Sequence, residues 1–317
     1  MSEPGVTTSA HLLADVVHTG SAPADASVGG IRTLASPSPG SIEVLGTRVH
    51  AMTPPDAADR VIRWALEGES RSVAVATVNN VMEGYDDPNY LAVMRRADLT
   101  TADGMPLVWA LRLFGAPVAR RVAGAELTPA ILRRAAPNGI PVGFFGGTPE
   151  VLVRLRGWAE ATFPGLDVAF VASPPFRPLS EREEEQVVAD IAASGARIVF
   201  VGLGCPKQEL WMDRVHGRLP AVTVGVGAAF DFLSGSKRRA PRFMQRAGLE
   251  WAFRLASEPR RLWRRYARHN PRFVALFIAQ FLHMRLGGRP SRRTRTTQTP
   301  KTAETLERTT QIQEGDT

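Results

Sequence analysis

The stretch Val201-Gly-Leu-Gly-Cys-Pro-Lys-Gln-Glu209 decides how this chain folds, because it joins a buried-looking strand to a helix through a glycine turn. Pro206 is expected in the first turn of that helix, where the N–H that proline lacks would have no partner. The free N–H groups of a helix N-terminus attract anions. Lys207 and Gln208 add side-chain donors at the same place. The stretch therefore predicts a βα turn that seats an anion.

Strands and helices alternate on both sides of this turn. We expect a short hairpin over 42–45 and 48–52, strands over 72–77, 99–101, 141–145, 167–171, 197–201 and 221–226, and helices over 54–66, 88–96, 106–114 and 180–194, with others starting near 126 and after 150. This alternation predicts an α/β fold with a Rossmann-like, mostly parallel sheet and helices on both faces. Ligands of such sheets bind beyond the carboxyl ends of the strands. We therefore expect one crevice, lined by the turns at 77–80, 102–104, 146–150, 202–209 and 227–231.

Composition divides the chain into four parts. Residues 1–40, rich in Ser, Ala, Pro and Gly, and the Thr-rich residues 291–317 are predicted to be disordered. Between them we expect a core over 41–236 and a helical, basic C-terminal appendage over 237–290. Residues 237–293 hold 16 of the 39 Lys and Arg but two of the 31 Asp and Glu, a net charge of +14. The rest of the chain, with 23 bases and 29 acids, carries −6.

Several protein classes do not fit this composition. A single cysteine, Cys205, excludes a disulfide framework and fits a reducing compartment. Residues 1–20 lack the pattern of a secretory signal peptide. The longest apolar-leaning stretch, 273–284, is shorter than the roughly 20 residues that span a bilayer. These features predict a cytoplasmic protein, either soluble or peripheral to a membrane.

The basic appendage implies an anionic partner. Arginines, Trp263 and Tyr266 come first, and a mostly apolar helix over 271–285 follows. This mixture suits an anionic membrane surface, with arginines at headgroups and aromatic rings at the boundary. A solvated helix pair that packs on the core is one alternative, and nucleic-acid binding is another. The apolar run has no obvious use on a duplex, so we expect no nucleic-acid partner.

Polar residues follow several of the predicted strands. Asp103 stands in a strand-to-helix turn, where an aspartate serves as a general base or as a helix N-cap. Thr77 and Asn79 follow a neighbouring strand and suit hydrogen bonds to a sugar, or turn formation. Asp231 suits contact with a ribose or base, or stabilisation of its own loop.

The glycine turns suit a nucleotide diphosphate, and the alternative is a tight turn without ligand. Candidate contacts are Gly146, Gly147, Thr148, Gly202, Gly204, Lys207, Gln208 and Glu209. The third glycine of the dinucleotide fingerprint is missing, which argues against a nicotinamide-dependent oxidoreductase. No P-loop pattern occurs either. No D-x-D pair exists to hold a metal on a diphosphate, and neither Cys nor His shows metal-ligand spacing. We expect no metal and no cofactor, with arginines supplying the cations.

Six motifs in order resemble the WecG/TagA/CpsF family of bacterial glycosyltransferases over about residues 41–266. They are Thr77-Val-Asn79, Ala102-Asp-Gly-Met105, Arg121-Val-Ala-Gly124, Phe145-Gly-Gly-Thr-Pro-Glu150, Val201–Glu209 and Val224-Gly-Val-Gly-Ala-Ala-Phe-Asp231. The sequence departs from the family in having Val78 where relatives often have proline, and in a longer extension over 271–285.

The resemblance implies inverting transfer of a sugar, N-acetylmannosamine or a related hexose, from a UDP-sugar to a polyprenyl-diphosphate-linked acceptor in cell-surface polysaccharide synthesis. The enzyme would be peripheral, on the inner face of the plasma membrane, and able to form homo-oligomers. Asp103 falls on the family's proposed base, and Thr77, Asn79, Arg121 and Gln208 fall on pocket positions. The appendage would bring arginines over the diphosphate, for which Arg254, Arg261 and Arg264 are candidates.

Overall fold

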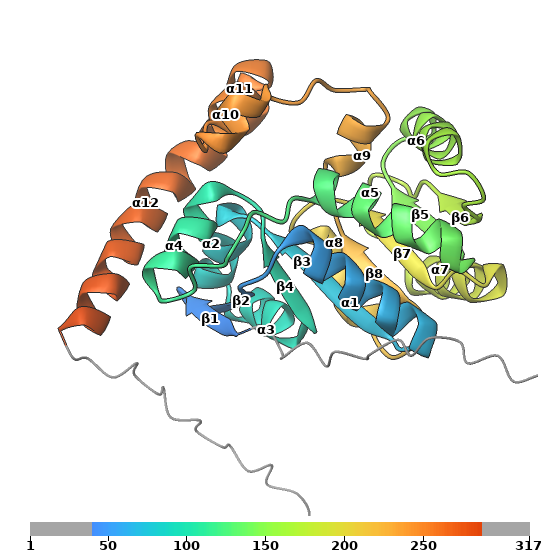
Figure 1. The fold of residues 1–317 in the computed structure, drawn as a ribbon, viewed down its shortest axis with the longest axis horizontal. Helices are drawn as coiled ribbons and strands as arrows, with labels where there is room; N and C mark the ends of the chain where they lie inside the picture. The colour runs from blue at the N-terminus through green and yellow to red at the C-terminus, as the bar shows by residue number, and fades with distance from the viewer. Residues whose placement is uncertain (1–39, 287–317) are drawn as a thin grey trace, which may run out of the picture. The chain divides into compact units, whose positions relative to one another are not determined.

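Six short runs of mostly small, β-branched and aromatic residues pair as parallel strands buried on both faces, as such runs do when helices cover both sides. We describe residues 40–286 from a computed structural model, without the side chains of Arg242 and Arg246; the rest of the predicted disordered segments lies outside this range. The sheet has the order β4-β3-β8-β7-β5-β6 (Figure 1). Its strands are β3 (Arg71–Ala76), β4 (Leu99–Ala102), β5 (Val142–Gly146), β6 (Val168–Ala172), β7 (Ile198–Gly202) and β8 (Val222–Gly225). The predicted α/β fold with a parallel sheet is confirmed.

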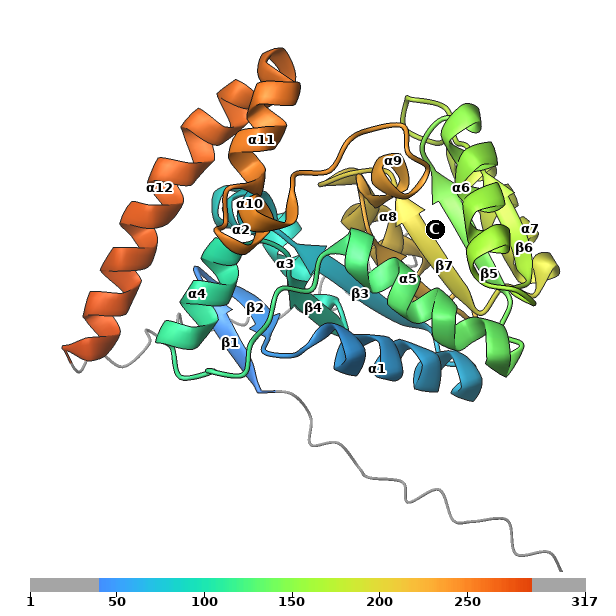
Figure 2. The same ribbon diagram turned by 45° about the horizontal axis from the view of Figure 1, so that its top comes forward.

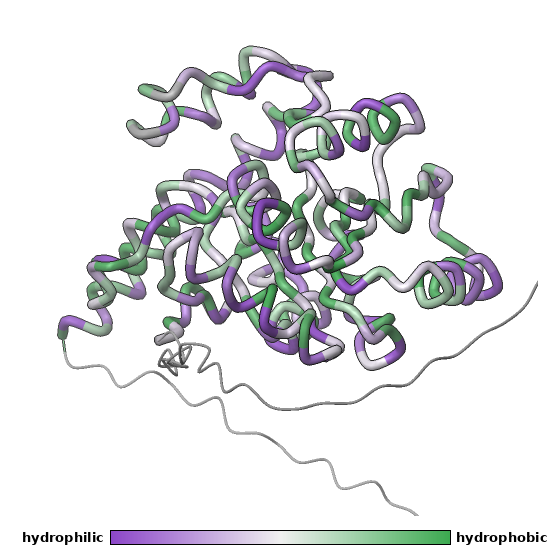
Figure 3. Tube along the Cα trace, turned by 45° about the vertical axis from the view of Figure 1, so that its right-hand side comes forward, coloured by the Kyte–Doolittle hydropathy of each residue, from purple (hydrophilic) through white to green (hydrophobic). Residues whose placement is uncertain are grey.

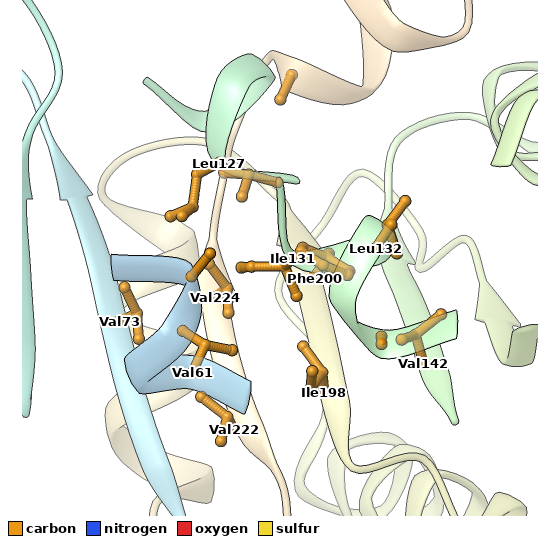
Figure 4. Close-up of a cluster of buried hydrophobic side chains, with 14 of the residues drawn as sticks. Val61, Val73, Leu127, Ile131, Leu132, Val142, Ile198, Phe200, Val222 and Val224 are labelled. Carbon is orange, nitrogen blue, oxygen red and sulfur yellow. The ribbon is translucent and has the colours of Figure 1, made fainter. Parts of the chain in front are cut away.

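Helices cover both faces of the sheet. One face carries α1 (Pro54–Glu67), α5 (Gly124–Ala135), α6 (Pro149–Thr162) and α9 (Ala229–Leu233). The other carries α2 (Val78–Asp86), α3 (Pro88–Arg96), α4 (Met105–Leu113), α7 (Glu181–Ser194) and α8 (Lys207–Val215). Side chains alternate along a strand, so successive residues of β7 pack on opposite faces of the sheet. Ile198 and Phe200 pack on the face that α1 and α5 cover (Figure 4), whereas Val199 and Val201 pack on the face that α7 and α8 cover.

Three local predictions need correction at the sheet's carboxyl edge. Residues 78–80 were expected to end a strand, but Val78 begins α2. The cause is a capping box: the Thr77 backbone N–H and Oγ1 both donate to Asn80 Oδ1, at 3.0 and 2.8 Å. Pro206 caps α8 instead of beginning it. A five-residue helix, α9, carries Asp231 where only a loop was expected.

The N-terminal hairpin and the appendage flank the core. β1 (Ser41–Val44) and β2 (Thr47–His50) pair antiparallel as predicted, and η1 (Ala136–Asn138) is a short 3₁₀ turn after α5. The appendage consists of α10 (Arg242–Arg246), α11 (Glu250–Ser257) and α12 (Pro259–Arg285), which confirms its helical character. The arginine-rich segment and the apolar segment over 271–285 form one helix. This helix, α12, continues through Pro271, although proline removes one backbone hydrogen bond.

Aromatic packing and ion pairs hold α12 against the core, beside α2 and α4 (Figure 2). Phe273 is buried and stacks on Phe277, which in turn contacts Phe114 after α4. Arg272 makes a two-pronged ion pair with Asp86 on α2, at 2.7 and 2.9 Å. Farther along, the amide of Gln280 donates to Glu43 O and accepts from the Leu45 N–H in the β1–β2 turn. Both polar and apolar contacts therefore hold the middle of α12 against the core.

Two glycines allow β5 and β7 to meet at their carboxyl ends. Gly146 and Gly202 are in register, and Gly146 has a φ of +113°. A Cβ on Gly146 would lie 2.7 Å from the Gly202 carbonyl carbon, and a Cβ on Gly202 would lie 2.5 Å from the Phe230 ring. Both positions thus require glycine for packing, whatever they bind.

We predict that Gly146→Ala lowers the free energy of unfolding by about 2–3 kcal/mol, through backbone strain and overpacking. Gly157→Ala is the matched control: Gly157 lies inside α6 with nothing within 4 Å of its Cβ position. That change should stabilise the fold by about 0.5–1 kcal/mol. Urea unfolding midpoints of the wild type and the two variants test this prediction. Equal midpoints of Gly146→Ala and the wild type would contradict the packing argument.

Candidate active site

Several of the predicted site residues lie where the strands end. β3 and β7 lead into α2 and α8 on one face of the sheet, whereas β8, which lies between them, leads into α9 on the other face. Strands whose connections depart in opposite directions open a crevice at their carboxyl ends. Thr77, Asn79 and Gln208 lie on the first side of this crevice, and Asp103 follows β4 at the edge of the sheet.

Asp103 is held by its backbone and surrounded by charge. Its N–H donates to Ala76 O at the end of β3, at 2.7 Å. The helix cap of α4 is Gly104, not Asp103, so the alternative role as N-cap does not apply. Burial raises the pKa of the Asp103 carboxyl to about 6, although Arg121 and Arg254 both favour its charged form. A carboxyl with this pKa is ionised at neutral pH and able to accept a proton.

Arg121 lies between the core and the appendage, with 11 % of its side chain exposed. Its guanidinium donates to Glu126 in the core at 2.9 Å, and to Glu250 and Gln245 of the appendage at 2.5 and 3.2 Å. Arg239 pairs with Glu126 as well, at 2.8 Å. We call these five residues the Arg121 cluster. It joins α10 and α11 to the core within electrostatic range of Asp103.

The three candidate arginines of the appendage lie in different surroundings. Arg254 on α11 is close enough to Asp103 to lower its pKa, and its guanidinium lies 5.7 Å from the Phe232 ring centre. Arg261 pairs with Glu258 one turn earlier. Arg264 is exposed and lies over the Trp263 ring. Of the three, the structure brings Arg254 to Asp103.

Asp231 takes part in a second bridge to the appendage. It pairs with Lys237 at 2.9 Å, and Lys237 also pairs with Glu258 at 3.2 Å. Glu258 in turn pairs with Arg261 at the start of α12. The carboxylate of Asp231 therefore links α9 to α12 in this structure, while its predicted contact with a ribose stays a prediction.

A buried polar network connects the first turns of α2 and α8. Glu209 Oε1 accepts from Gln208 Nε2 at 2.7 Å and from Asn80 Nδ2 at 3.0 Å. Asn80 Nδ2 also donates to the Tyr90 hydroxyl at 3.0 Å. Asn79 Nδ2 donates to the Cys205 sulfur at 3.2 Å, and Tyr90 lies 3.4 Å from the same sulfur. Asn80 and Tyr90 were not predicted as site residues, and the Asn79-Asn80 pair after a strand was the available signal.

Cys205 therefore has a structural place, because its sulfur accepts a hydrogen bond from Asn79 on α2 and shares another with the Tyr90 hydroxyl on α3. Burial raises the pKa of its thiol to about 12, which keeps the sulfur protonated and unreactive. Three buried oxygens on these turns accept no hydrogen bond within the described part of the chain: Asn79 Oδ1, Gln208 Oε1 and Glu209 Oε2. The two amide oxygens suit a ligand that carries hydroxyl or N–H donors.

The remaining predicted contacts lie on the glycine turns. Thr148 caps α6 by accepting from the Val151 N–H, and the Gly147 carbonyl accepts from Ser173 at 2.7 Å. Gly204 has a φ of +77° and open space where a Cβ would stand. Lys207 is exposed in the first turn of α8. Gly204 and Lys207 are thus accessible, whereas Gly146 and Gly202 are covered by each other and by Phe230.

Within residues 40–286, no three His, Cys, Asp or Glu side chains gather as ligands of a metal ion. Over the same residues, every helix is too short or too polar to cross a bilayer.

Comparison with known proteins identifies the family. Residues 42–287 match the glycosyl transferase WecG/TagA/CpsF family. The chain is also 32% identical, over 225 residues, to an N-acetylglucosaminyldiphosphoundecaprenol N-acetyl-beta-D-mannosaminyltransferase from Bacillus spizizenii; the match covers 70% of this chain and 84% of that protein. The chain belongs to the WecG/TagA/CpsF family and is a glycosyltransferase, as the six motifs predicted. This assignment favours neither the oxidoreductase nor the nucleic-acid-binding alternative.

We predict that Asp103 titrates with a pKa of about 6. Arg121→Gln should raise that pKa by removing a cation, and Glu250→Gln should lower it by removing an anion. Carbon-13 NMR of aspartate-labelled protein measures each value, with Asp103→Asn assigning the resonance. Glu185→Gln, an exposed change on α7, should leave the pKa of Asp103 unchanged. Titration of Asp103 near its ordinary 3.8 would contradict the burial argument.

Proposed function

We propose that this member of the WecG/TagA/CpsF family transfers a sugar from a UDP-sugar to a polyprenyl-diphosphate-linked acceptor, with inversion at the anomeric carbon. The observation that carries the proposal is Asp103, a carboxylate with a pKa near neutrality that two arginines flank at the carboxyl edge of the sheet. The name of the Bacillus spizizenii relative supports N-acetylmannosamine as the sugar and N-acetylglucosaminyl-diphospho-undecaprenol as the acceptor.

Asp103 is the general base in this mechanism. Its carboxylate takes the proton of the acceptor hydroxyl as the hydroxyl oxygen bonds to the anomeric carbon. The bond from that carbon to the UDP oxygen breaks on the opposite side, which inverts the configuration and releases UDP. The Asn79 and Gln208 amide oxygens, unpaired in the described structure, support contacts with sugar hydroxyls.

Cationic side chains stabilise the charge that develops on the departing diphosphate. Arg254 is the appendage arginine whose charge lowers the pKa of Asp103, and Lys207 is exposed at the N-terminus of α8. Arg121 adds a largely shielded guanidinium, which pairs with Glu126 of the core and Glu250 of the appendage. Preorganised cations of this kind act most strongly where water is excluded. We propose that they serve in place of a metal ion, and transfer should therefore be unchanged by EDTA.

We further propose that the appendage attaches the enzyme to the inner face of the plasma membrane. Val274, Ile278 and Leu282 are each about half exposed and recur every four residues, so they form one outward stripe on α12. Hydrophobic and hydrophilic residues alternate along this helix (Figure 3). Such a helix lies in an anionic interface with its apolar stripe toward the acyl chains. This position would bring the site to a lipid-linked acceptor.

We predict that the purified protein releases UDP when given UDP-N-acetylmannosamine and a short-chain polyprenyl-diphosphate-N-acetylglucosamine. Asp103→Asn should lower kcat/KM by about 100-fold or more, since it removes the base without changing the side-chain size. The wild-type rate should rise with pH through about 6, because the ionised carboxylate is the active form. Equal rates of the wild type and Asp103→Asn at every pH would remove Asp103 from the mechanism.

Membrane attachment is tested by flotation with liposomes that contain phosphatidylglycerol. We predict that the wild type floats and that Ile278→Asp combined with Leu282→Asp abolishes flotation. The two introduced carboxylates would have to leave water for the apolar side of the membrane interface, which costs free energy. Val153→Asp is the control, since Val153 is exposed on α6 of the core. Loss of flotation in the control as well would argue against a specific role of α12.

A further inference from the structure

Glu209 is a buried carboxylate without a cation. Its side chain is 3% exposed and lies in the first turn of α8, next to Gln208. Oε1 accepts from two amides, and Oε2 is buried without a partner among the described residues. Burying a carboxylate is costly unless a cation or hydrogen bonds offset the loss of water, and burial raises the pKa of Glu209. A buried acid at this position therefore calls for an explanation. The contacts of Glu209 supply that explanation.

A carboxyl oxygen that carries no proton accepts hydrogen bonds and cannot donate them, and Oε1 of Glu209 accepts two here. A side-chain amide beside it must therefore present its NH₂ group and turn its oxygen away. Glu209 imposes this orientation on Gln208 and on Asn80 at the same time. The Asn80 oxygen then faces Thr77, where it closes the capping box of α2.

The oxygen of Gln208 is turned toward the end of β8. A Cβ on Gly227 would lie 3.6 Å from Gln208 Oε1, and a Cβ on Gly225 would lie 3.1 Å from Nε2. These two glycines leave room for the amide beside the strand. Oε1 is thus buried, unpaired in the described structure and directed to the turn that leads into α9.

We propose that Glu209 is a positioning residue for sugar transfer: it fixes the amide of Gln208 so that Oε1 accepts a hydrogen bond from the bound sugar nucleotide. It also ties Gln208 to Asn80, so that the β3–α2 and β7–α8 turns keep one spacing. The inference rests on the proposed function, and it adds that Glu209 acts through Gln208 without touching the substrate.

A double-mutant cycle between Glu209 and Gln208 tests this role. Glu209→Leu removes the acceptor of the Gln208 amide and one of the two acceptors of the Asn80 amide, and it should lower kcat/KM by about 10-fold to 100-fold. In a Gln208→Ala background the same change should have little further effect, because the group that it orients is gone. Glu209→Gln should lose less activity than Glu209→Leu, since its oxygen can still accept from both amides. Additive losses in the cycle would overturn the proposal.

The control is Glu184→Leu, which removes another buried carboxylate beside α8. Glu184 pairs with Arg214 at 2.7 Å and lies outside the candidate site. It should lower the unfolding midpoint but leave kcat/KM unchanged, which separates positioning from general destabilisation. Failure of the wild type to transfer any sugar would defeat the proposed function, whereas additivity in an active enzyme defeats only the role of Glu209.

Discussion

The guanidinium of Arg121 is largely shielded from water, with 11 % of the side chain exposed, and a shielded cation needs counter-charges. The core supplies Glu126, and the appendage supplies Glu250 together with the amide of Gln245. Because these partners come from segments about 120 residues apart, their pairing fixes α10 and α11 against the core. The same cluster contributes to the electrostatic surroundings of Asp103. One shielded charge therefore couples the position of the appendage to the pKa of Asp103.

The high positive charge of the appendage is used in two ways. Several of its bases are paired with acids, either in the core or at the start of α12: Lys237, Arg239, Arg261, Arg268 and Arg272. These pairs dock the appendage. Others, such as Arg264, are exposed on the outer side of α12, where an anionic surface can reach them. The net charge read from sequence thus overstates the charge that is available to a partner.

The fold was predictable from sequence because buried parallel strands are continuous apolar runs that alternate with capped helices. Motif order likewise led to the family and to Asp103. The capping box that begins α2 was not predicted, because the hydrogen bonds between Thr77 and Asn80 become evident only in the structure. The Arg121 cluster and the Glu209 network were not predicted for a related reason. Their residues are distant in sequence, and local sequence patterns do not indicate which distant side chains contact each other.

The contact between Arg121 and Glu250 has one more consequence. A diphosphate that bound to Arg121 would meet a guanidinium already paired with a carboxylate of the same chain. Such binding would exchange one anion for another, so its free energy would be the difference between two ion pairs and not the gain of one. The displaced carboxylate would be that of α11, the helix that carries Arg254, so the exchange would remove one of the contacts between this helix and the core. Ligand charge and helix position would then belong to a single equilibrium.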